Sequence, residues 1–266
     1  MIPHDLTEEN YFSPENERKY MGSSQFKRFM ACEDAALASL MGNIREEQTD
    51  ALIIGSYVDA HFSGTLDVFM AKHPELFTKS GGLKAQYRHA DYMIQRAERD
   101  PLFMKYMSGE KQVIMTGEIA GTPFKIKTDS FHPGKCIVDL KCVKDFRSIW
   151  DESSHSRKHF IDYWGYPLQG AVYQEIVRQN TGQKLPFFIA AVTKEKEPDI
   201  QVYRIPDEVL ADRLSEVITL IPRFRQIKEG KLVPQRCGEC RWCRFSKVLT
   251  SPVDYREEME VYDVSE

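Results

Sequence analysis

The sequence predicts an α/β protein in which a mixed central sheet lies between layers of helices. The first observation is a change of hydrophobic periodicity along the chain, in the order helix, three strands, helix and strand. The second is a pair of turn-forming stretches, 120–123 and 132–135, which separate the three strands. The third is an ordinary globular composition, with 42% hydrophobic and 29% charged residues among 266. The predicted core is therefore an αβββαβ succession.

Each expected element follows from a local signal. Ser23 or Ser24 can cap a helix that runs to about Leu40, and the stretch 80–82, Ser-Gly-Gly, opens a loop before a long polar helix. The expected helices are 23–40, 49–62, 84–107, 159–179 and 207–228. The expected strands are 112–118, 124–131, 136–143, 186–193 and 199–204. The strands are short and the helices are amphipathic, as an α/β layer architecture requires.

Charge and hydropathy exclude several classes of protein. The chain has 40 acidic and 36 basic residues and a net charge of −4, which argues against a protein that coats nucleic acid. The longest apolar run, 187–192, is far shorter than the roughly 18–20 residues of a membrane helix. The first residues lack the basic and apolar regions of a secretory signal. We therefore expect a cytoplasmic protein whose six cysteines are thiols or metal ligands.

The hairpin that contains the loop 133–135 is the most informative part of the chain. Side chains alternate along a strand, so Asp139 and Lys141 share the face opposite the apolar residues of their strand, as Asp129 does on the preceding strand. If both apolar faces lie on one side of the sheet, even-numbered residues oppose even-numbered ones, which requires an odd-numbered loop or a bulge. With a three-residue loop, Asp129 lies opposite Asp139, with Cβ atoms on the order of 5 Å apart.

Two carboxylates this close repel each other unless a cation lies between them. Mg²⁺ and Mn²⁺ suit such oxygen ligands, because they bind one or two carboxylates together with waters and a substrate phosphate. Lys141 projects toward the same site, where it can orient or deprotonate a water or offset charge that develops on a phosphate. The alternative is that Asp and Lys simply alternate on a solvated strand face.

These residues resemble the active site of the PD-(D/E)XK nucleases, and most closely the RecB-like and RecE-like exonuclease branch found in phages. The resemblance rests on Asp129, on Asp139-Leu-Lys141, and on a following helix with Gln169 and Tyr173, which share one helical face. It implies a restriction-endonuclease-like fold with extra N- and C-terminal helices. It divides the chain into a polar segment 1–22, one nuclease domain 23–246 closed by a cysteine-rich stretch, and an acidic tail 247–266. It also implies that Gln169 and Tyr173 contact DNA and the active-site lysine.

The family has a further metal ligand on an upstream helix, usually the histidine of Gly-x-x-x-His. Here Gly55 is followed at that spacing by Asp59, and histidine comes two residues later as His61. Residues two apart on a helix diverge by about 200°, so the two cannot easily share one direction. The resemblance implies Asp59, Asp129 and Asp139 as metal ligands, with His61 as the alternative and Glu118 as an auxiliary carboxylate.

Four of the six cysteines form a candidate ligand set. Cys237, Cys240 and Cys243 lie within seven residues, and Cys32 of the first helix is the candidate fourth ligand. Relatives of the RecB-like branch join their chain ends in this manner around a [4Fe-4S] cluster, and zinc would suit four thiolates equally well. A metal-free turn is the third interpretation, because the spacing between Cys240 and Cys243 is shorter than the spacing between the last two cysteines in the iron–sulfur nucleases. Cys136 and Cys142 fall on the apolar face of the hairpin and are most simply buried thiols.

The weak overall charge requires any contacts with DNA to be local. The candidate phosphate contacts lie on the acid face of the hairpin, after the catalytic strand, and beside the cysteines. They are Lys125, Lys127, Lys144, Arg147, Arg157, Lys158, Arg241 and Arg244. Trp242 and Phe245, which alternate with the last two arginines, add possible stacking surfaces. The simpler interpretation is that these charged residues are only exposed to solvent and contact no DNA.

The leading hypothesis is a metal-dependent DNA exonuclease that hydrolyses phosphodiester bonds at DNA ends in phage-type recombination or repair. Its partners would be linear duplex DNA or single-stranded ends, a single-strand annealing recombinase and, in a homo-oligomer, further copies of the chain. Family chemistry implies a 5′-phosphate and a 3′-hydroxyl as products. The alternatives are a CRISPR-adaptation-type nuclease that trims DNA ends, a non-catalytic DNA-binding relative, and a generic α/β protein stabilised by zinc.

Overall fold

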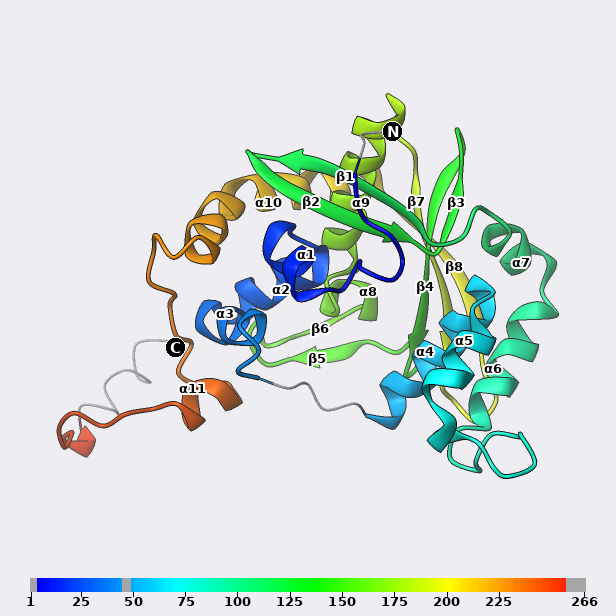
Figure 1. Cartoon of the computed structure of the whole chain (residues 1–266), viewed down its shortest axis with the longest axis horizontal. Coiled ribbons are helices and arrows are strands. Elements are labelled where there is room, and N and C mark those ends of the chain that lie inside the picture. Colours follow the sequence, from blue (N-terminus) through cyan, green and yellow to red (C-terminus); the bar gives the residue numbers. More distant parts are fainter. Residues whose placement is uncertain (1–3, 45–48, 257–266) are drawn as a thin grey trace.

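The computed structural model describes residues 4–44 and 49–256, and a mixed four-stranded sheet forms its centre (Figure 1). Its strands, in spatial order, are β3 (Ser130–His132), β4 (Cys136–Val143), β7 (Phe187–Thr193) and β8 (Ile200–Ile205). β4 and β7 run parallel, whereas β3 and β8 pair antiparallel at the two edges. The predicted fold class, a mixed central sheet with flanking helices, is confirmed.

Two small antiparallel hairpins lie outside this sheet. They consist of β1 (Val113–Ile119) with β2 (Thr122–Thr128), and of β5 (Ile149–Asp151) with β6 (Ser156–Lys158). The β5–β6 hairpin is not among the predicted strands, because its strands have three residues each and little apolar alternation. The prediction of one continuous strand 124–131 was wrong, since Asp129 interrupts it and leaves β2 and β3 in different sheets.

The helices surround the sheet. They are α1 (Pro14–Lys19), α2 (Ser23–Ala31), α3 (Glu33–Leu40), α4 (Asp50–Ser63), α5 (Leu66–Lys72), the short η1 (Pro74–Leu76), α6 (His89–Glu98), α7 (Pro101–Met107), α8 (Phe160–Tyr163), α9 (Tyr166–Thr181), α10 (Asp207–Lys228) and α11 (Arg241–Phe245). In Figure 1, α4 to α7 gather on one side of the sheet, and α2, α9 and α10 lie on the other. None of the helices in the described residues has the length and apolarity needed to cross a membrane.

Three of the predicted helices are each broken in two. Cys32 has an extended backbone, with φ −166° and ψ 113°, and separates α2 from α3, so it does not lie on the first helix. Pro101 begins α7, because proline disfavours a helical residue before it, and the Asp100 side chain caps the new helix. Gly165, at φ 62°, ends α8 and precedes α9. The residue before α2 is Gly22, one position earlier than the predicted serine cap.

Two hydrophobic cores fill the two faces of the sheet. Ile137 packs in the core beneath α9, whereas Val138 and Leu140 pack in the core beneath α4 and α6. This alternation along β4 directs the odd-numbered side chains, including Asp139 and Lys141, toward the α9 side. The expectation that both strands of the hairpin share one apolar face was wrong, because the break at Asp129 turns the apolar residues of β2 into the α9-side core.

The N-terminal segment is packed against this domain. Leu6, Tyr11 and Tyr20 form a small third core together with Ile114 of β1. At the other end, the expected acidic tail is described only as far as Arg256, and residues 257–266 lie outside the described residues. The N-terminal segment therefore contributes side chains to the region next to β1 and β2.

Candidate active site and cysteine cluster

The β3–β4 hairpin has the three-residue loop that the acid pair requires. Ser130 pairs with Val138 and His132 with Cys136, which leaves residues 133–135 in the loop. Continuing this register brings Asp129 beside Asp139, and the Oδ2 atom of Asp129 accepts a hydrogen bond from the Leu140 amide at 2.7 Å. The predicted neighbourhood of the two acids is thus present, although Asp129 lies at a break between strands rather than within one.

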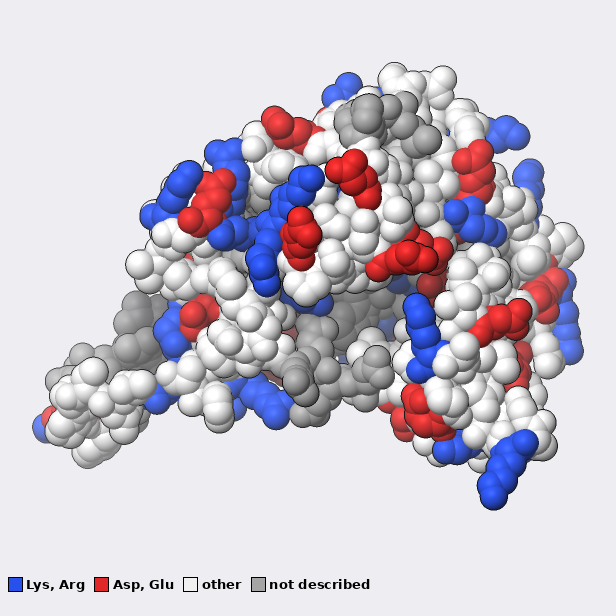
Figure 2. Space-filling view, viewed as in Figure 1, with Lys and Arg blue, Asp and Glu red and all other residues white. Residues whose placement is uncertain are grey.

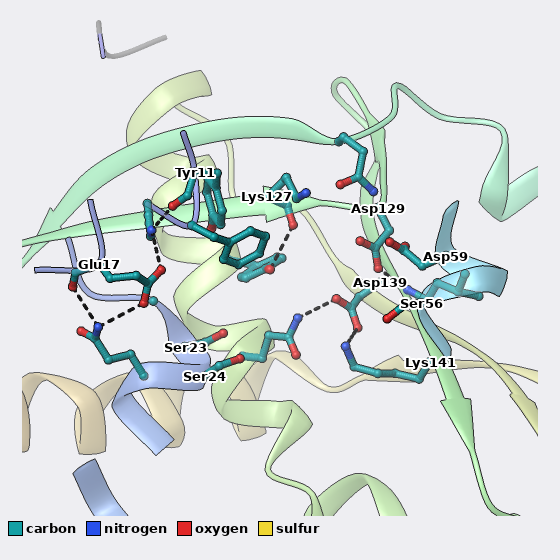
Figure 3. A pocket seen from close by; sticks show the side chains of 18 of the residues that line it. Tyr11, Glu17, Ser23, Ser24, Ser56, Asp59, Lys127, Asp129, Asp139 and Lys141 are labelled. Atoms are coloured by element: carbon teal, nitrogen blue, oxygen red, sulfur yellow. Dashed lines mark hydrogen bonds and ion pairs between the residues drawn. The ribbon is translucent and has the colours of Figure 1, made fainter. Parts of the chain in front are cut away.

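The acids open into a polar cavity of about 470 Å³, which we call the carboxylate cavity (Figure 3). Its walls come from the N-terminal segment, α2, α4, the hairpin β1–β2, β4 and α9. The predicted site residues among its lining are Asp59, Lys125, Lys127, Asp129, Asp139, Lys141, Gln169 and Tyr173. Residues far apart in the sequence therefore converge on one concave site, as a catalytic centre requires.

Asp139 is held from two directions. Its side chain is almost fully buried, Oδ1 accepts a hydrogen bond from Gln169 Nε2 at 2.6 Å, and Oδ2 lies 2.5 Å from Lys141 Nζ. Gly170 lets α9 carry Gln169 this close, because a Cβ atom at that position would lie 2.6 Å from the Phe187 ring on β7. Gln169 and Lys141 thus fix the orientation of the carboxylate at the centre of the cavity.

Burial and, to a lesser extent, repulsion between the acids shift the pKa values in the carboxylate cavity. Burial raises the pKa of Asp129 well above its ordinary value, and the negative charges of Asp139 and Asp59 raise it further. Burial also raises the pKa of Asp59, although Lys127 partly opposes this effect. Burial lowers the pKa of Lys141, but Asp139 and Asp129 more than compensate and leave it above the ordinary value. The acids of the cavity are thus buried close to one another, with Lys127 and Lys141 as the cations that oppose the rise in their pKa.

The residues fit a hard divalent cation. Three carboxylates supply only oxygen ligands, and Asp139 Oδ2 is buried without a hydrogen-bond donor of good geometry, despite the nearby ammonium of Lys141. A cation would satisfy this oxygen and relieve the repulsion that raises the Asp129 pKa. The carboxylates line one cavity, but among the described residues only the cysteines bring three or more potential ligand atoms within 4.8 Å of one another.

The structure separates the candidates for the helical ligand. Asp59 of α4 lines the cavity and faces Asp129 in Figure 3. His61 lies outside the cavity lining and makes a 2.8 Å contact with Glu98 on α6. Glu118, at the end of β1, is exposed and also lies outside the lining. The geometry therefore favours Asp59, and neither His61 nor Glu118 is near the acid pair in this arrangement.

Tyr173 connects α9 to the edge of the cavity. Its hydroxyl donates a hydrogen bond to the Lys127 carbonyl at 3.0 Å, and its ring meets Phe187 edge to face. Burial raises the Tyr173 pKa well above its ordinary value, so the hydroxyl keeps its proton. Tyr173 is therefore placed to hold β2 against α9 and thereby to position Lys127.

The predicted basic residues occupy different environments. Lys125 is buried, and its ammonium contacts Glu17 at 2.7 Å and the Tyr11 carbonyl, so its interpretation as a phosphate contact is corrected. Lys127 lines the cavity and is half-buried. Lys144, Arg147 and Arg157 are exposed, with Arg147 paired to Asp145 and Glu195. Lys158 is paired with Asp151, and Arg241 and Arg244 are exposed beside the cysteines.

Sequence reasoning missed several residues that line the cavity. Tyr11 and Phe12 belong to the segment 1–22, which was interpreted only as polar, although two adjacent aromatic residues in polar surroundings were a visible signal. Ser23 and Ser56 also reach the cavity, from α2 and α4. Gln112, just before β1, carries no motif at all and could not have been found from the sequence.

The cysteine cluster consists of Cys32, Cys237, Cys240 and Cys243, whose sulfur atoms all lie within 4.8 Å of one another. Cys32 Sγ is 3.6 Å from Cys243 Sγ, although the residues are 211 positions apart. Backbone amides of Cys240 and Glu239 lower the pKa of Cys237 to about 6, which favours a thiolate. Four sulfur ligands in this compact arrangement fit zinc or an iron–sulfur cluster.

Side chains next to the cysteine cluster hold its two halves together. Glu33 accepts two hydrogen bonds from Arg223 of α10, at 2.6 and 2.8 Å, and a third from the Gln235 amide. Asp34 accepts from the Trp242 indole at 2.9 Å and pairs with Arg236. Glu33 and Asp34, which directly follow Cys32, thus bind the segment that contains the C-terminal cysteines.

The remaining two cysteines are separate from the cluster. Cys136 is buried, and Cys142 is half-buried at the far end of β4. Burial raises the pKa of the Cys142 thiol to about 12, which keeps it protonated. Both therefore behave as apolar core residues, as expected.

The comparisons with known proteins identify the family. A family model described as a PDDEXK-like domain of unknown function (DUF3799) matches residues 22–246. The chain belongs to this PDDEXK-like family. The resemblance to the PD-(D/E)XK nucleases is thereby confirmed. None of the curated proteins matches the chain.

Solved structures extend this finding. A crystal structure from Eubacterium rectale, which bears the name "Putative exonuclease", is 46% identical and has a TM-score of 0.89 to this PDDEXK-like chain. The alignment covers 96% of this chain and 98% of that one. The crystal structure of SSO0001 aligns at 11% identity over 84% of this chain and 95% of that one, with a TM-score of 0.28, which is too low to compare the folds.

Proposed function

We propose that this PDDEXK-like protein is a divalent-metal-dependent exodeoxyribonuclease that acts at the ends of linear DNA. The observation that carries the proposal is the convergence of Asp59, Asp129, Asp139 and Lys141 on one cavity. The exonuclease name of the 46% identical relative supports attack from an end. A role in phage-type recombination beside a single-strand annealing protein, and assembly into a homo-oligomer, complete the proposal.

Asp59, Asp129 and Asp139 would hold the cation, Mg²⁺ or Mn²⁺. Such an ion, when bound, supplies Lewis-acid activation of water and neutralises charge on the phosphate. Asp139 can take part only in the orientation that Gln169 gives it, because the amide occupies its Oδ1 atom. The raised pKa of Asp129 means that cation binding must compete with a proton at this residue.

Lys141 would act on the attacking water and on the phosphate charge. Its raised pKa keeps the ammonium protonated near neutrality, so it would orient the water and stabilise developing negative charge rather than take a proton. The Tyr166 ring, whose centroid is 5.1 Å from Lys141 Nζ, limits where this ammonium can move. Lys141 is therefore held beside Asp139 at the cavity.

DNA would reach the carboxylate cavity through few phosphate contacts. Figure 2 shows basic and acidic side chains interspersed over one face, rather than one broad basic surface. Lys127 at the cavity and the exposed residues Lys144 and Arg147 after β4 are the candidate contacts. A small number of contacts predicts a weak salt dependence of binding, because each phosphate contact adds to the salt slope.

The deciding experiment digests a linear duplex labelled at its ends, with Mg²⁺ or Mn²⁺, and a circular duplex of the same sequence. We expect the native protein to degrade only the linear form, and Asp139→Asn and Lys141→Met to be inactive. Glu118→Gln and Lys135→Met, exposed residues outside the cavity, are matched controls. The proposal fails if the native protein leaves linear DNA intact with both ions, or if the two cavity variants digest it normally.

For the cysteine cluster we propose a [4Fe-4S] cluster, with zinc as the second candidate. The four sulfur ligands are already close together, and their position at the chain ends favours a structural rather than a catalytic role. Protein purified without oxygen should be brown and should contain four iron atoms for each chain, as the cluster formula requires. A colourless protein with one zinc ion would establish the second candidate instead.

A further inference from the structure

Gln112 has an unusual backbone conformation. Its φ of +51° lies in the left-handed region, where the Cβ atom of an L-residue crowds the following carbonyl oxygen. Ala120 and His155 are the other non-glycine residues with positive φ in the described part of the chain, and both lie in hairpin turns. A two-residue hairpin turn itself requires positive φ, which accounts for Ala120. Gln112 lies in no hairpin turn, so its conformation needs another explanation.

The side chain of Gln112 is equally unusual. It lines the carboxylate cavity, and its Nε2 atom is buried without a hydrogen-bond partner. A buried amide donor that lacks a partner costs stability, and strained backbone conformations concentrate at functional sites. The neighbouring Lys111 does not occupy the same space, since its ammonium contacts the Met107 carbonyl. The strained backbone of Gln112 and its unpaired amide nitrogen both lower the stability of the fold.

The contents of the cavity define what the amide can bind. Two of the buried polar atoms without a good hydrogen-bond partner lie in it, namely Asp139 Oδ2, an acceptor, and Gln112 Nε2, a donor. A phosphodiester accompanied by a cation would satisfy both, because Asp139 would help to hold the cation and a phosphate oxygen would accept a hydrogen bond from the Gln112 amide. An anionic oxygen is a stronger acceptor than a neutral one, which suits an isolated donor.

We propose that the Gln112 side-chain amide donates a hydrogen bond to a nonbridging oxygen of the scissile phosphate. The inference rests on the proposed function, because it assumes that a phosphodiester enters the carboxylate cavity. Gln112 would then be a substrate-binding residue of the active site. It lies just before β1, a strand that contains none of the predicted catalytic residues. The backbone strain then orients the amide before the substrate arrives.

The test uses Gln112→Gly, with Ala120→Gly as the matched control. Glycine removes the left-handed strain at both positions, so each variant should melt about 1–3 °C above the native protein. Only Gln112→Gly should lose activity, by about 10- to 100-fold in kcat/KM, as expected when a hydrogen bond to a charged oxygen is removed. A lower melting temperature for Gln112→Gly, or unchanged activity, would overturn the inference.

Gln112→Glu distinguishes a donor from a metal ligand. It keeps the size of the side chain but replaces the amide donor with a carboxylate, which repels the phosphate and the nearby Asp129. We expect kcat/KM to fall at least as far as in Gln112→Gly. Native activity, or tighter binding of Mn²⁺ with retained activity, would show instead that the side-chain oxygen matters, and would overturn the inference.

A binding measurement separates this inference from the proposed function. Affinity for an end-labelled duplex is measured by fluorescence anisotropy with Ca²⁺ in place of Mg²⁺, for the native protein and both glycine variants. We expect weaker binding only for Gln112→Gly. If the native protein cleaves no DNA but this difference is present, the nuclease proposal fails and the phosphate contact stands. If all three proteins bind equally, the contact is refuted whatever the activity.

Discussion

The carboxylate cavity and the cysteine cluster are both candidate metal sites, but the fold assembles them differently. The four sulfur atoms lie within 4.8 Å of one another, whereas the three carboxylates line a cavity but do not bring three oxygen atoms that close together. The pKa values of Cys32 and Cys240 are raised, so these thiols stay neutral beside the Cys237 thiolate and the sulfur atoms can lie close together with little repulsion. Carboxylates that are buried together are costly to ionise, and burial followed by the charges of Asp139 and Asp59 raises the pKa of Asp129.

The difference corresponds to two kinds of metal site. A structural site has a closed set of protein ligands, whereas a catalytic site keeps positions open for water and substrate. The side chains beside the cysteine cluster, Glu33 and Asp34, fasten backbone segments together. Those beside the carboxylate cavity, Gln169 and Lys141, hold the carboxylate itself. The first site is thus organised for stability, and the second for the orientation of a reacting group.

The largest effect is expected for Asp129→Asn, which separates activity from stability. Removing this carboxylate should lower the rate of DNA digestion by about 10²- to 10³-fold, because both the charge and a metal ligand are lost. The same change removes repulsion from Asp139 and Asp59, and the asparagine oxygen can still accept from the Leu140 amide. With a chelator present, its melting temperature should therefore exceed that of the native protein. Lower stability without metal would refute the repulsion.

The opposite pattern is expected for Cys32→Ser. Losing one of four ligands should release the metal and lower the melting temperature by more than about 10 °C, given the large folding energy of a structural metal. Activity measured well below that temperature should persist. Cys136→Ala, which removes a buried thiol outside the cluster, is the control and should keep the full metal content. Full metal retention by Cys32→Ser would contradict the assignment of this ligand.

A smaller effect is expected for Glu33→Gln, which weakens the ion pair between Glu33 and Arg223 next to the cysteine cluster. The two hydrogen bonds from Arg223 lose their charged acceptor, so we expect a loss of about 1–2 kcal/mol in unfolding free energy, discounted because the arginine is partly exposed. Denaturant unfolding measures this loss. The exposed pair of Arg213 and Glu216 provides the control, since Glu216→Gln should change stability by less than about 0.5 kcal/mol. Equal effects would mean that Glu33 has no special role.

The smallest effect concerns pH. The folded pKa of Asp129 lies above that of the unfolded chain, about 4, so unfolding releases a proton between these values and stability falls as the pH rises. The slope contributed by this group is at most about 1.4 kcal/mol per pH unit. Melting curves with a chelator, from pH 4 upward, should show a steeper decline for the native protein than for Asp129→Asn. Parallel curves would assign the effect to other groups.

The sequence predicts the chemistry of both sites better than their geometry. The order of elements follows from periodicity and turn residues. The predicted three-residue loop 133–135 is present and brings Asp129 beside Asp139, although the shared apolar face from which it was predicted is not. The break at Asp129 could not be predicted, because it depends on where β1 and β2 pack against α9 rather than on local propensity. Cys32 likewise lies between two helices, where it contacts Cys243 and where the next residue, Glu33, accepts a hydrogen bond from the Gln235 amide; local propensity does not reveal these distant contacts.

The residues that sequence reasoning missed are those with tertiary causes. Gln112 becomes notable only through its backbone angle and its missing hydrogen-bond partner. Lys125 has the sequence pattern of a phosphate contact, yet burial against Glu17 gives it a structural role. The alternation of side chains along a strand predicts which face of the strand a lysine lies on, but not which other segment of the chain covers that face. Here a segment more than a hundred residues earlier in the chain covers it.

The position of the cysteine cluster imposes an order on biosynthesis. A ribosome makes the chain from its N-terminus, so Cys32 emerges early and waits until Cys237, Cys240 and Cys243 have been added. Every predicted catalytic residue, from Asp59 to Tyr173, has been translated before that moment. A metal held by all four cysteines could therefore bind only after Cys243 has been added, and a chain that stops before Cys237 would contain every predicted catalytic side chain but only one of the four candidate ligands.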